Sequence, residues 1–511
     1  MSYILAHDLG TTGVKAALFD EAGALAASAG RQYPTLDSGA GGYEQNPADW
    51  IAAVAESSRE ALERASASPS DVAAISVSGH MMGVVALDAE NLPVRPAILH
   101  SDIRSRAQLR AIRERMAPAR VHQMSGNPLD VHYPWAKIAW LRDTEPENYA
   151  AASLFVQSKD YITAWMTGSR PVTDWSDASL YGCFDFHRMA WSAELCDAAG
   201  IDAEKLPGIV EAGTLAGALA PAPARLLGLR DGIPVYIGFG DGASAAVGCG
   251  CWEPGSVYNY VGSTSWVSVT TNRPVIDEEG RAFTLALTRD RFALLGTVQC
   301  AGAAWDWAVT RLCESHFEEA EALAASSPPG ANGLLFLPYL SGERAPIWND
   351  RARGVWFGLS TAHGPADLLR SVLEGVGFAL GSVLEEIRRC TGVDPASIRL
   401  IGGAVRGRLL RDIIAACFGC PVQCVAEAGE ATGRGAFVAA AVGSGLVSGF
   451  DSAPGLLPPH SVHCPDARLA ADYEAARALF DALYGRLAGS FDDLARLRER
   501  LGAEGDGHAA L

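Results

Sequence analysis

Two short stretches, almost half the chain apart, share one pattern and constrain the fold more than any other feature. Residues 3–20 contain a β-prone arm, the turn Gly10-Thr11-Thr12-Gly13 and a second β-prone arm. Residues 256–271 repeat this order around Gly262-Ser263-Thr264-Ser265. Hydroxyl groups and successive N–H groups in such a turn can form a concave anion-binding site. The repeat suggests a duplicated domain whose halves face one another across a ligand.

Charged residues flank the first turn. Asp8 ends the first arm, and Lys15 lies just inside the second arm. A carboxylate beside a phosphate-sized anion requires a cation such as Mg²⁺ between them. Taken alone, the stretch is explained equally well as a solvated hairpin whose turn residues suit the backbone.

Strand and helix signals alternate along both halves, which is typical of an α/β fold. Asn46 and Pro47 mark a helix start as N-cap and first helical residue. At 511 residues the chain is too long for one hydrophobic core, so we expect two domains. Further strands are expected at 71–79, 235–238, 283–288 and 292–298, and helices from 242, from 303, over 365–391 and over 467–501.

Composition excludes several classes of partner. The 41 basic and 59 acidic residues give a net charge of -18, which argues against nucleic acid. We expect no membrane span, because no run of about 18 uninterrupted apolar residues occurs. The first residues do not resemble a signal peptide, and the 11 cysteines suit reduced thiols, so we expect a cytoplasmic location. The cysteines at 417, 420 and 424 lack a fourth metal ligand and are expected to be structural.

These motifs resemble the FGGY carbohydrate kinases, the family that contains xylulokinase and glycerol kinase. The matching segments are 8–12 with Lys15, 43–50, 158–161, 173–179, 240–242, 262–265, 338–346 and 402–405. The resemblance implies two actin/hexokinase-like (ribonuclease H-like) domains with an interdomain cleft. It places an N-terminal domain at 1–248, a nucleotide-binding C-terminal domain at 249–465, and a helix with a flexible tail at 466–511.

The resemblance also implies roles for individual residues in ATP- and Mg²⁺-dependent phosphoryl transfer. Asp241 would be the general base, kept anionic by the start of its helix; the alternative is an ordinary N-cap. Asp8 would hold Mg²⁺ through water. The implied nucleotide-binding residues are Gly10, Thr11, Thr12 and Lys15 on one side, Gly262, Ser263 and Thr264 on the other, and Gly302, Asp306, Gly402 and Gly403 near the adenosine.

The sugar pocket is expected to contain His80, Met81, Asp102 and Arg104. A carboxylate and a guanidinium both suit a polyol. Xylulokinases usually carry Gln-Met-His where this chain has His80-Met81-Met82, and a Trp where it has His100. The resemblance therefore predicts a ketopentose such as D-xylulose as acceptor, with another ketose or polyol (tetrulose, hexulose, erythritol or glycerol type) as the alternative.

A protein of another class on the same fold is also considered: a catalytically silent actin-like ATPase or a sugar sensor. Asp241 and the two phosphate turns argue against loss of catalysis. The sequence does not give the oligomeric state, although related enzymes are often homodimers.

Overall fold

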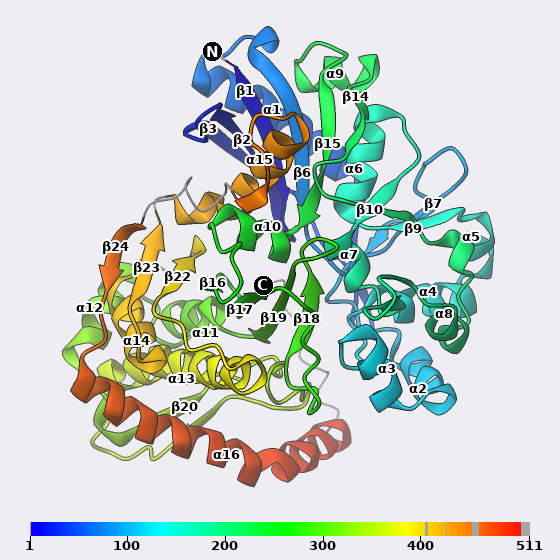
Figure 1. Cartoon of the computed structure of the whole chain (residues 1–511). Coiled ribbons are helices and arrows are strands. Elements are labelled where there is room, and N and C mark those ends of the chain that lie inside the picture. The colour runs from blue at the N-terminus through cyan, green and yellow to red at the C-terminus, as the bar shows by residue number, and fades with distance from the viewer. Residues whose placement is uncertain (1, 404–406, 426, 452–458, 502–511) are drawn as a thin grey trace.

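The first half of the chain forms one twisted sheet. The computed structural model describes residues 2–403, 407–425, 427–451 and 459–501 (Figure 1). The strand order of this sheet is β14-β15-β6-β1-β2-β3. Its strands are β1 (Tyr3–Leu9), β2 (Gly13–Asp20), β3 (Leu25–Gln32), β6 (Val72–Gly79), β14 (Leu215–Ala218) and β15 (Pro234–Gly240).

The second half forms a sheet of order β18-β19-β17-β16-β22-β23-β24. Its strands are β16 (Val257–Val261), β17 (Ser265–Thr271), β18 (Phe283–Ala286), β19 (Phe292–Val298), β22 (Ile398–Ile401), β23 (Val422–Val425) and β24 (Pro459–His463).

The two sheets share one topology. In the first, β1 pairs antiparallel with β2 and parallel with β6. In the second, β16 pairs antiparallel with β17 and parallel with β22. The next strand is again parallel in each case, β15 beside β6 and β23 beside β22, and an antiparallel edge strand follows. The duplication suggested by the two turns is therefore present in the fold.

Helices cover both sheets. Near the first sheet, α1 (Pro47–Ala65) packs on β2 and β3, and Asn46 caps it by accepting from the Ala48 N–H at 3.1 Å. In the second half, α13 (Pro365–Thr391) packs on β17 and β19 and is itself covered by α14 (Arg408–Phe418) and α16 (Ala467–Arg500) (Figure 1).

Shorter elements complete the two halves. The helices are α2 (Arg106–Arg115), α3 (Pro118–Ser125), α4 (Pro134–Thr144), α5 (Pro146–Ala151), α6 (Ser158–Thr167), α7 (Trp175–Ser179), α8 (Ala193–Ala199), α9 (Pro221–Leu227), α11 (Gly302–Trp307) and α12 (Phe317–Ser326). The strands are β4 (Leu36–Gly39), β5 (Gly42–Gln45), β7 (Val85–Leu87), β8 (Ala97–Ile98), β9 (Leu154–Val156), β10 (Val172–Asp174), β11 (Phe184–Asp185), β12 (Ala190–Trp191), β13 (Gly208–Val210), β20 (Leu335–Leu337) and β21 (Val355–Phe357).

Two helices cross where the halves meet, α10 (Asp241–Gly248) and α15 (Ala431–Gly443). A Cβ on Gly248 would lie 1.8 Å from the Ala431 carbonyl oxygen, and one on Gly435 would lie 2.1 Å from the Ser244 carbonyl oxygen. Only glycine allows this approach. Although α15 lies between β23 and β24 of the second sheet in sequence, it packs on β1, β6 and β15 of the first sheet.

Most predicted elements are confirmed, including strand 292–298 and helix 365–391 with the predicted bounds. The cysteines at 417, 420 and 424 form no disulfide. Cys417 lies in the last turn of α14, whose C-cap is Gly419, and Cys424 lies in β23. The predicted tail at 502–511 lies outside the described residues.

Candidate active site

A cleft of about 2550 Å³ lies between the two halves and is lined by residues of both. It gathers the predicted site residues, with the exception of Asp102 and Arg104. Those that line it are Asp8, Gly10, Thr11, Thr12, Lys15, His80, Met81, Asp241, Gly262, Ser263, Thr264, Gly302, Asp306, Gly402 and Gly403.

The two glycine–hydroxyl turns both open into this cleft. The first is closed by the Gly10 N–H donating to the Gly13 carbonyl at 2.9 Å, and the second by Gly262 N–H donating to Thr264 at 2.9 Å. The Gly302 N–H, at the start of α11, donates to the Gly262 carbonyl at 2.9 Å. The start of α11 is thereby held against the second turn.

Lys15 crosses from one half to the other. Its Nζ donates to the Gly429 carbonyl oxygen at 2.6 Å and lies 3.7 Å from Glu430 Oε1. The side chain remains half-exposed at the cleft wall. Lys15 thus lines the cleft near the first turn while also joining the two halves.

Two carboxyl groups face the cleft between the turns. Asp8 lies at the end of β1, next to its last residue Leu9, and Asp241 is the first residue of α10. Burial, with a smaller contribution from the Asp8 charge, raises the pKa of Asp241 to about 7. Burial likewise raises the pKa of Asp8 to about 6, although Lys15 opposes this shift. A divalent cation bound beside desolvated carboxyl groups would favour their charged forms.

Two expectations about Asp241 need correction. The N-cap of α10 is Gly240, so the alternative role of Asp241 as an ordinary N-cap is wrong. Its Oδ1 accepts from the Gly242 N–H at 2.7 Å, and this bond favours the anion. Burial nevertheless outweighs the helix start, so Asp241 is a stronger base than expected.

A buried ionic network lies behind Asp241. Lys159 Nζ lies 2.6 Å from Asp160, 2.9 Å from Asp174 and 2.9 Å from Asp177. Asp174 also accepts from the Ser176 hydroxyl at 2.5 Å, and Ser176 Oγ accepts from the Gly240 N–H at 2.8 Å. The network therefore fixes the backbone immediately before Asp241.

The predicted adenosine end is built from glycines of the second half. Gly402 has φ +101°, and a Cβ there would lie 2.4 Å from the Val261 carbonyl oxygen. Among the described residues, nothing lies within 4 Å of a Cβ on Gly403. The neighbouring motif residues 404 and 405 lie outside the described residues.

The predicted acceptor end lies beside Asp241. Met81 packs against this strand end, since a Cβ on Gly240 would lie 2.7 Å from its Cε. His80 is 2% exposed, and neither ring nitrogen has a hydrogen-bond partner among the described residues. Burial lowers the pKa of His80 to about 4, so its imidazole is neutral. His100 lines the same end.

Asp102 and Arg104 do not line the cleft. Arg104 Nη2 lies 2.6 Å from Asp102 Oδ2 and 2.5 Å from Glu44 Oε1, and the guanidinium stacks 4.3 Å from the Trp140 ring centroid. Asp102 also accepts from the Tyr43 N–H at 3.0 Å. The two side chains satisfy each other and stabilise the wall behind His100, so their positions do not support direct contact with a sugar.

Sequence reasoning missed several residues at this end, above all Arg344, with Glu343, Asp130 and His132. Glu343 and Arg344 lie within segment 338–346, which was quoted for the resemblance without a chemical role. Glu343 Oε1 accepts from the N–H groups of Gln299 at 2.6 Å and Arg344 at 2.8 Å. Burial raises the pKa of Glu343 to about 8.

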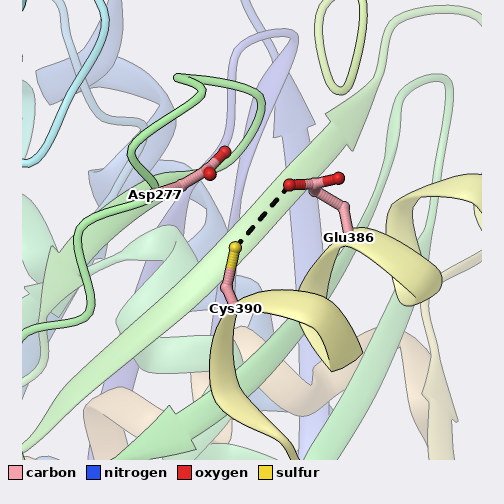
Figure 2. A group of neighbouring side chains, drawn as sticks. All are labelled: Asp277, Glu386 and Cys390. Atoms are coloured by element: carbon pink, nitrogen blue, oxygen red, sulfur yellow. Dashed lines mark hydrogen bonds between the residues drawn. The ribbon is translucent and has the colours of Figure 1, made fainter.

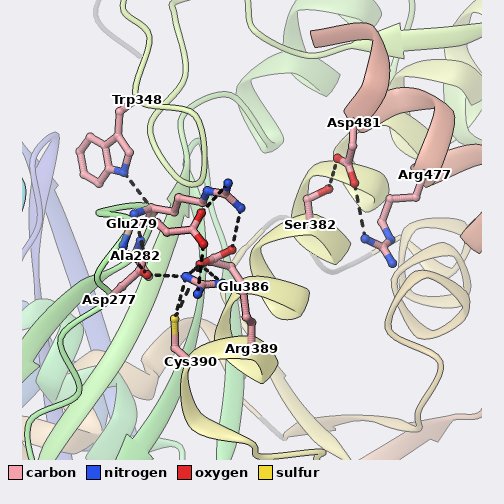
Figure 3. A network of polar contacts seen from close by, with 11 residues as sticks. Asp277, Glu279, Ala282, Trp348, Ser382, Glu386, Arg389, Cys390, Arg477 and Asp481 are labelled. Atoms are coloured by element: carbon pink, nitrogen blue, oxygen red, sulfur yellow. Dashed lines mark hydrogen bonds and ion pairs between the residues drawn. The ribbon is translucent and has the colours of Figure 1, made fainter. Parts of the chain in front are cut away.

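Outside the cleft, the described residues contain one group of ligand-type side chains: Asp277, Glu386 and Cys390 (Figure 2). Arg389 donates to both carboxylates and so already supplies the positive charge (Figure 3). Burial raises the pKa of Cys390 to about 12, which keeps it a thiol. Asp277 also accepts from the Arg281 and Ala282 N–H groups at 2.6 and 2.9 Å. The group organises a loop and does not fit a metal.

Comparison with known proteins decides the family. Residues 3–248 match the N-terminal domain of the FGGY family of carbohydrate kinases, and residues 257–444 match its C-terminal domain. The chain is an FGGY carbohydrate kinase. A kinase of this family is a phosphotransferase that uses ATP, and its fold is the two-domain actin/hexokinase-like architecture described above. The boundary at 248/249 and the separate status of residues 466–511 stay predictions.

Relatives of this kinase carry two different names. It is 32% identical to the xylulose kinase of Escherichia coli (strain K12), over 94% of this chain and 98% of that protein. It is 29% identical to the gluconokinase of Bacillus licheniformis, over 98% of this chain and 99% of that protein. The structure of ligand-bound xylulose kinase from Lactobacillus acidophilus superposes with a TM-score of 0.90 at 26% identity, and the match covers 97% of this chain and 100% of that protein. Within the described residues, no helix is both long and apolar enough to cross a bilayer.

Proposed function

We propose that this kinase transfers the terminal phosphoryl group of ATP to a hydroxyl of a small polyhydroxy acceptor, with Asp241 as the general base. One observation carries this: Asp241 lies in the same cleft as both glycine–hydroxyl turns and the His80–Met81 end. Asp241 takes the hydroxyl proton, the acceptor oxygen bonds to the γ-phosphorus, and the bond to the β–γ bridging oxygen breaks to release ADP.

The chain's residues divide between the two substrates. The turns at 10–13 and 262–264 would offer N–H and hydroxyl donors to the phosphates. Asp8 would hold Mg²⁺, which supplies charge neutralisation at the phosphates. Gly402 and Gly403 would let the backbone approach the adenosine, beside Gly302 and Asp306.

For the acceptor, we propose only a chemical class of compound. Names of relatives support both a ketopentose such as D-xylulose and an aldonate such as gluconate. The departures at His80, Met82 and His100 separate this chain from the usual xylulokinase pattern, so another ketose or polyol remains the alternative. Homodimerisation and a cytoplasmic location also stay predictions.

The test is ADP release with ATP, Mg²⁺ and a panel of ketoses, polyols and aldonates. We expect Asp241→Asn to lower kcat by about 10² to 10⁴ while ATP still binds, because a general base contributes that much. Asp231→Asn, at the other end of the same strand–helix unit and exposed, is the matched control. Turnover of Asp241→Asn within about tenfold of the unmodified enzyme contradicts the assignment, and ADP release that needs no acceptor favours the ATPase alternative.

A further inference from the structure

Arg344 carries an unused hydrogen-bonding edge in the acceptor end of the cleft. Its Nε and Nη2 are buried and have no hydrogen-bond partner among the described residues. The guanidinium lies beside two rings that contact each other edge to face, with Cζ 5.5 Å from the Phe283 centroid and 5.4 Å from the Trp348 centroid. Trp348 is fixed in turn by donating to the Arg281 carbonyl at 3.0 Å (Figure 3). Nε and Nη2 form the side of a guanidinium that matches a carboxylate bidentately.

The acidic side chains nearby do not bind the free edge of Arg344. Glu343, the adjacent residue, points its Oε1 at two backbone N–H groups, and burial raises its pKa to about 8. Asp130 lies close enough for the Arg344 charge to help lower the pKa of Asp130, but its Oδ1 contacts the His132 ring and accepts from the His132 N–H at 2.9 Å. Asp102 is paired with Arg104. Nε and Nη2 of Arg344 are therefore left for a ligand.

Two cationic side chains act on His100 at this end. Burial lowers the pKa of His100 well below its usual range, and the charges of Lys137 and Arg344 lower it further. These side chains therefore lie close enough to act on one another. His80 adds two unpartnered ring nitrogens. A cluster of this kind disfavours further positive charge and favours an anion.

Further arginines line the cleft, beside acidic residues such as Asp37 and Asp492, in a protein of net charge -18. Arg110 and Arg113 on α2 are exposed, line the cleft and form no ion pair within the described residues. Arg106, on the same face, lies 2.7 Å from Asp350 across the entrance. Local basic groups at an entrance attract anions in spite of an acidic overall charge.

We propose that the acceptor carries a carboxylate, as an aldonate does, and that Arg344 binds this carboxylate through Nε and Nη2 while a hydroxyl faces Asp241. This rests on the proposed function, since it names the acceptor class of the same site. The hydroxyl oxygens of a neutral ketose can accept from this edge, but they carry no charge and do not match its fork, so their hydrogen bonds are weaker than those of a carboxylate.

The experiment compares gluconate with glucitol, which carries CH₂OH in place of the carboxylate, and with D-xylulose. With ATP and Mg²⁺ we expect kcat/KM for gluconate to exceed that for glucitol by about 10- to 100-fold, the range of a charge-assisted hydrogen bond. Arg344→Gln should raise KM for gluconate by a similar factor with kcat little changed. Arg344→Lys should restore only part of the loss, because it keeps the charge without the fork. Arg120→Gln, at an exposed ion pair on α3, is the control and should change neither value.

Calorimetry of gluconate binding without ATP separates the two proposals. If D-xylulose is phosphorylated better than gluconate and Arg344→Gln affects both alike, the carboxylate is overturned and the kinase assignment stands. If no acceptor is phosphorylated but gluconate binds and Arg344→Gln abolishes binding, the anion site stands and the proposed function fails. Tighter binding of glucose 6-phosphate than of gluconate overturns the carboxylate as the ligand class.

Discussion

At the scale of single residues, the cleft holds ionisable groups in states that cost folding free energy. A carboxyl group whose pKa is raised by folding binds its proton more tightly in the folded than in the unfolded state. Its contribution to stability therefore declines as pH rises from the unfolded pKa near 4 through the folded pKa. Asp241, with a pKa of about 7, falls in this class.

Asp241→Asn should therefore stabilise the ligand-free protein as it removes activity. We expect a gain of about 1 kcal/mol at pH 8, less than the full pKa shift because Asp241 is partly exposed to solvent, and no gain near pH 4. Thermal unfolding at both pH values, without nucleotide, measures it. A melting temperature at pH 8 equal to or below that of the unmodified protein would contradict this prediction.

Lys159 is the opposite case, because its charge is required by its surroundings. Lys159→Met would leave Asp160, Asp174 and Asp177 buried without their cation. We expect a loss of about 3 kcal/mol in urea unfolding, the size found when one partner of a buried pair is removed. Lys205→Met, whose ammonium is only part-buried and contacts carbonyls, serves as control and should lose less. Equal losses of unfolding free energy in the two variants would show that the three buried carboxylates do not depend on the charge of Lys159.

At the scale of elements, the crossing of α10 and α15 joins the two halves through glycines. Gly248→Ala would place a methyl group 1.8 Å from the Ala431 carbonyl oxygen. The two helices must then move apart, which displaces Asp241 at the start of α10. We expect unfolding at lower urea concentration and a kcat reduced about tenfold or more, since small displacements of a base are costly.

The matched control is Gly489→Ala in α16, where nothing lies within 4 Å of the added Cβ. This change should stabilise the protein by up to about 1 kcal/mol, because alanine favours a helix. Retention of full activity and stability by Gly248→Ala would show that the crossing tolerates a wider spacing than the structure has.

Local sequence signals predicted most of these elements and missed what depends on distant partners. The turn at Gly10, the cap at Asn46 and the helix at 365–391 follow from neighbouring residues. The sequence predicts Arg104 in the sugar pocket, whereas in the structure it pairs with Glu44 and stacks on Trp140. These partners come from other segments, so local sequence signals could not reveal them. Arg344 was overlooked for the same reason: an unpaired edge can be seen only once every neighbour has a position.

At the scale of the whole molecule, a large buried cluster continues from one half into the other, although each half also has a cluster of its own. The largest buried cluster includes Phe239 from the first sheet, Tyr258 and Phe283 from the second, and Phe437 from α15. Residues 1–248, although predicted as a domain, therefore lack the helix that covers β1, β6 and β15.

We expect the fragment 1–248 to aggregate or to bind ANS, since an uncovered apolar face is exposed. The full chain should unfold in one transition. Gel filtration, ANS fluorescence and circular dichroism of the fragment beside the full chain measure this. A monomeric fragment with its own cooperative transition would show that α15 is dispensable to the first sheet.

The glycine crossing also determines how the enzyme can move. Gly248 lies two turns from Asp241 on the same short helix. If the two halves rotate about the crossing of α10 and α15, the displacement of a residue grows with its distance from that crossing. Asp241 then moves little, while Arg106 and Asp350, which form an ion pair across the cleft, move further. Spin labels at Asp37 and Arg351 should report a shortened distance on ATP binding. Closure would then deliver the phosphate to a stationary proton acceptor.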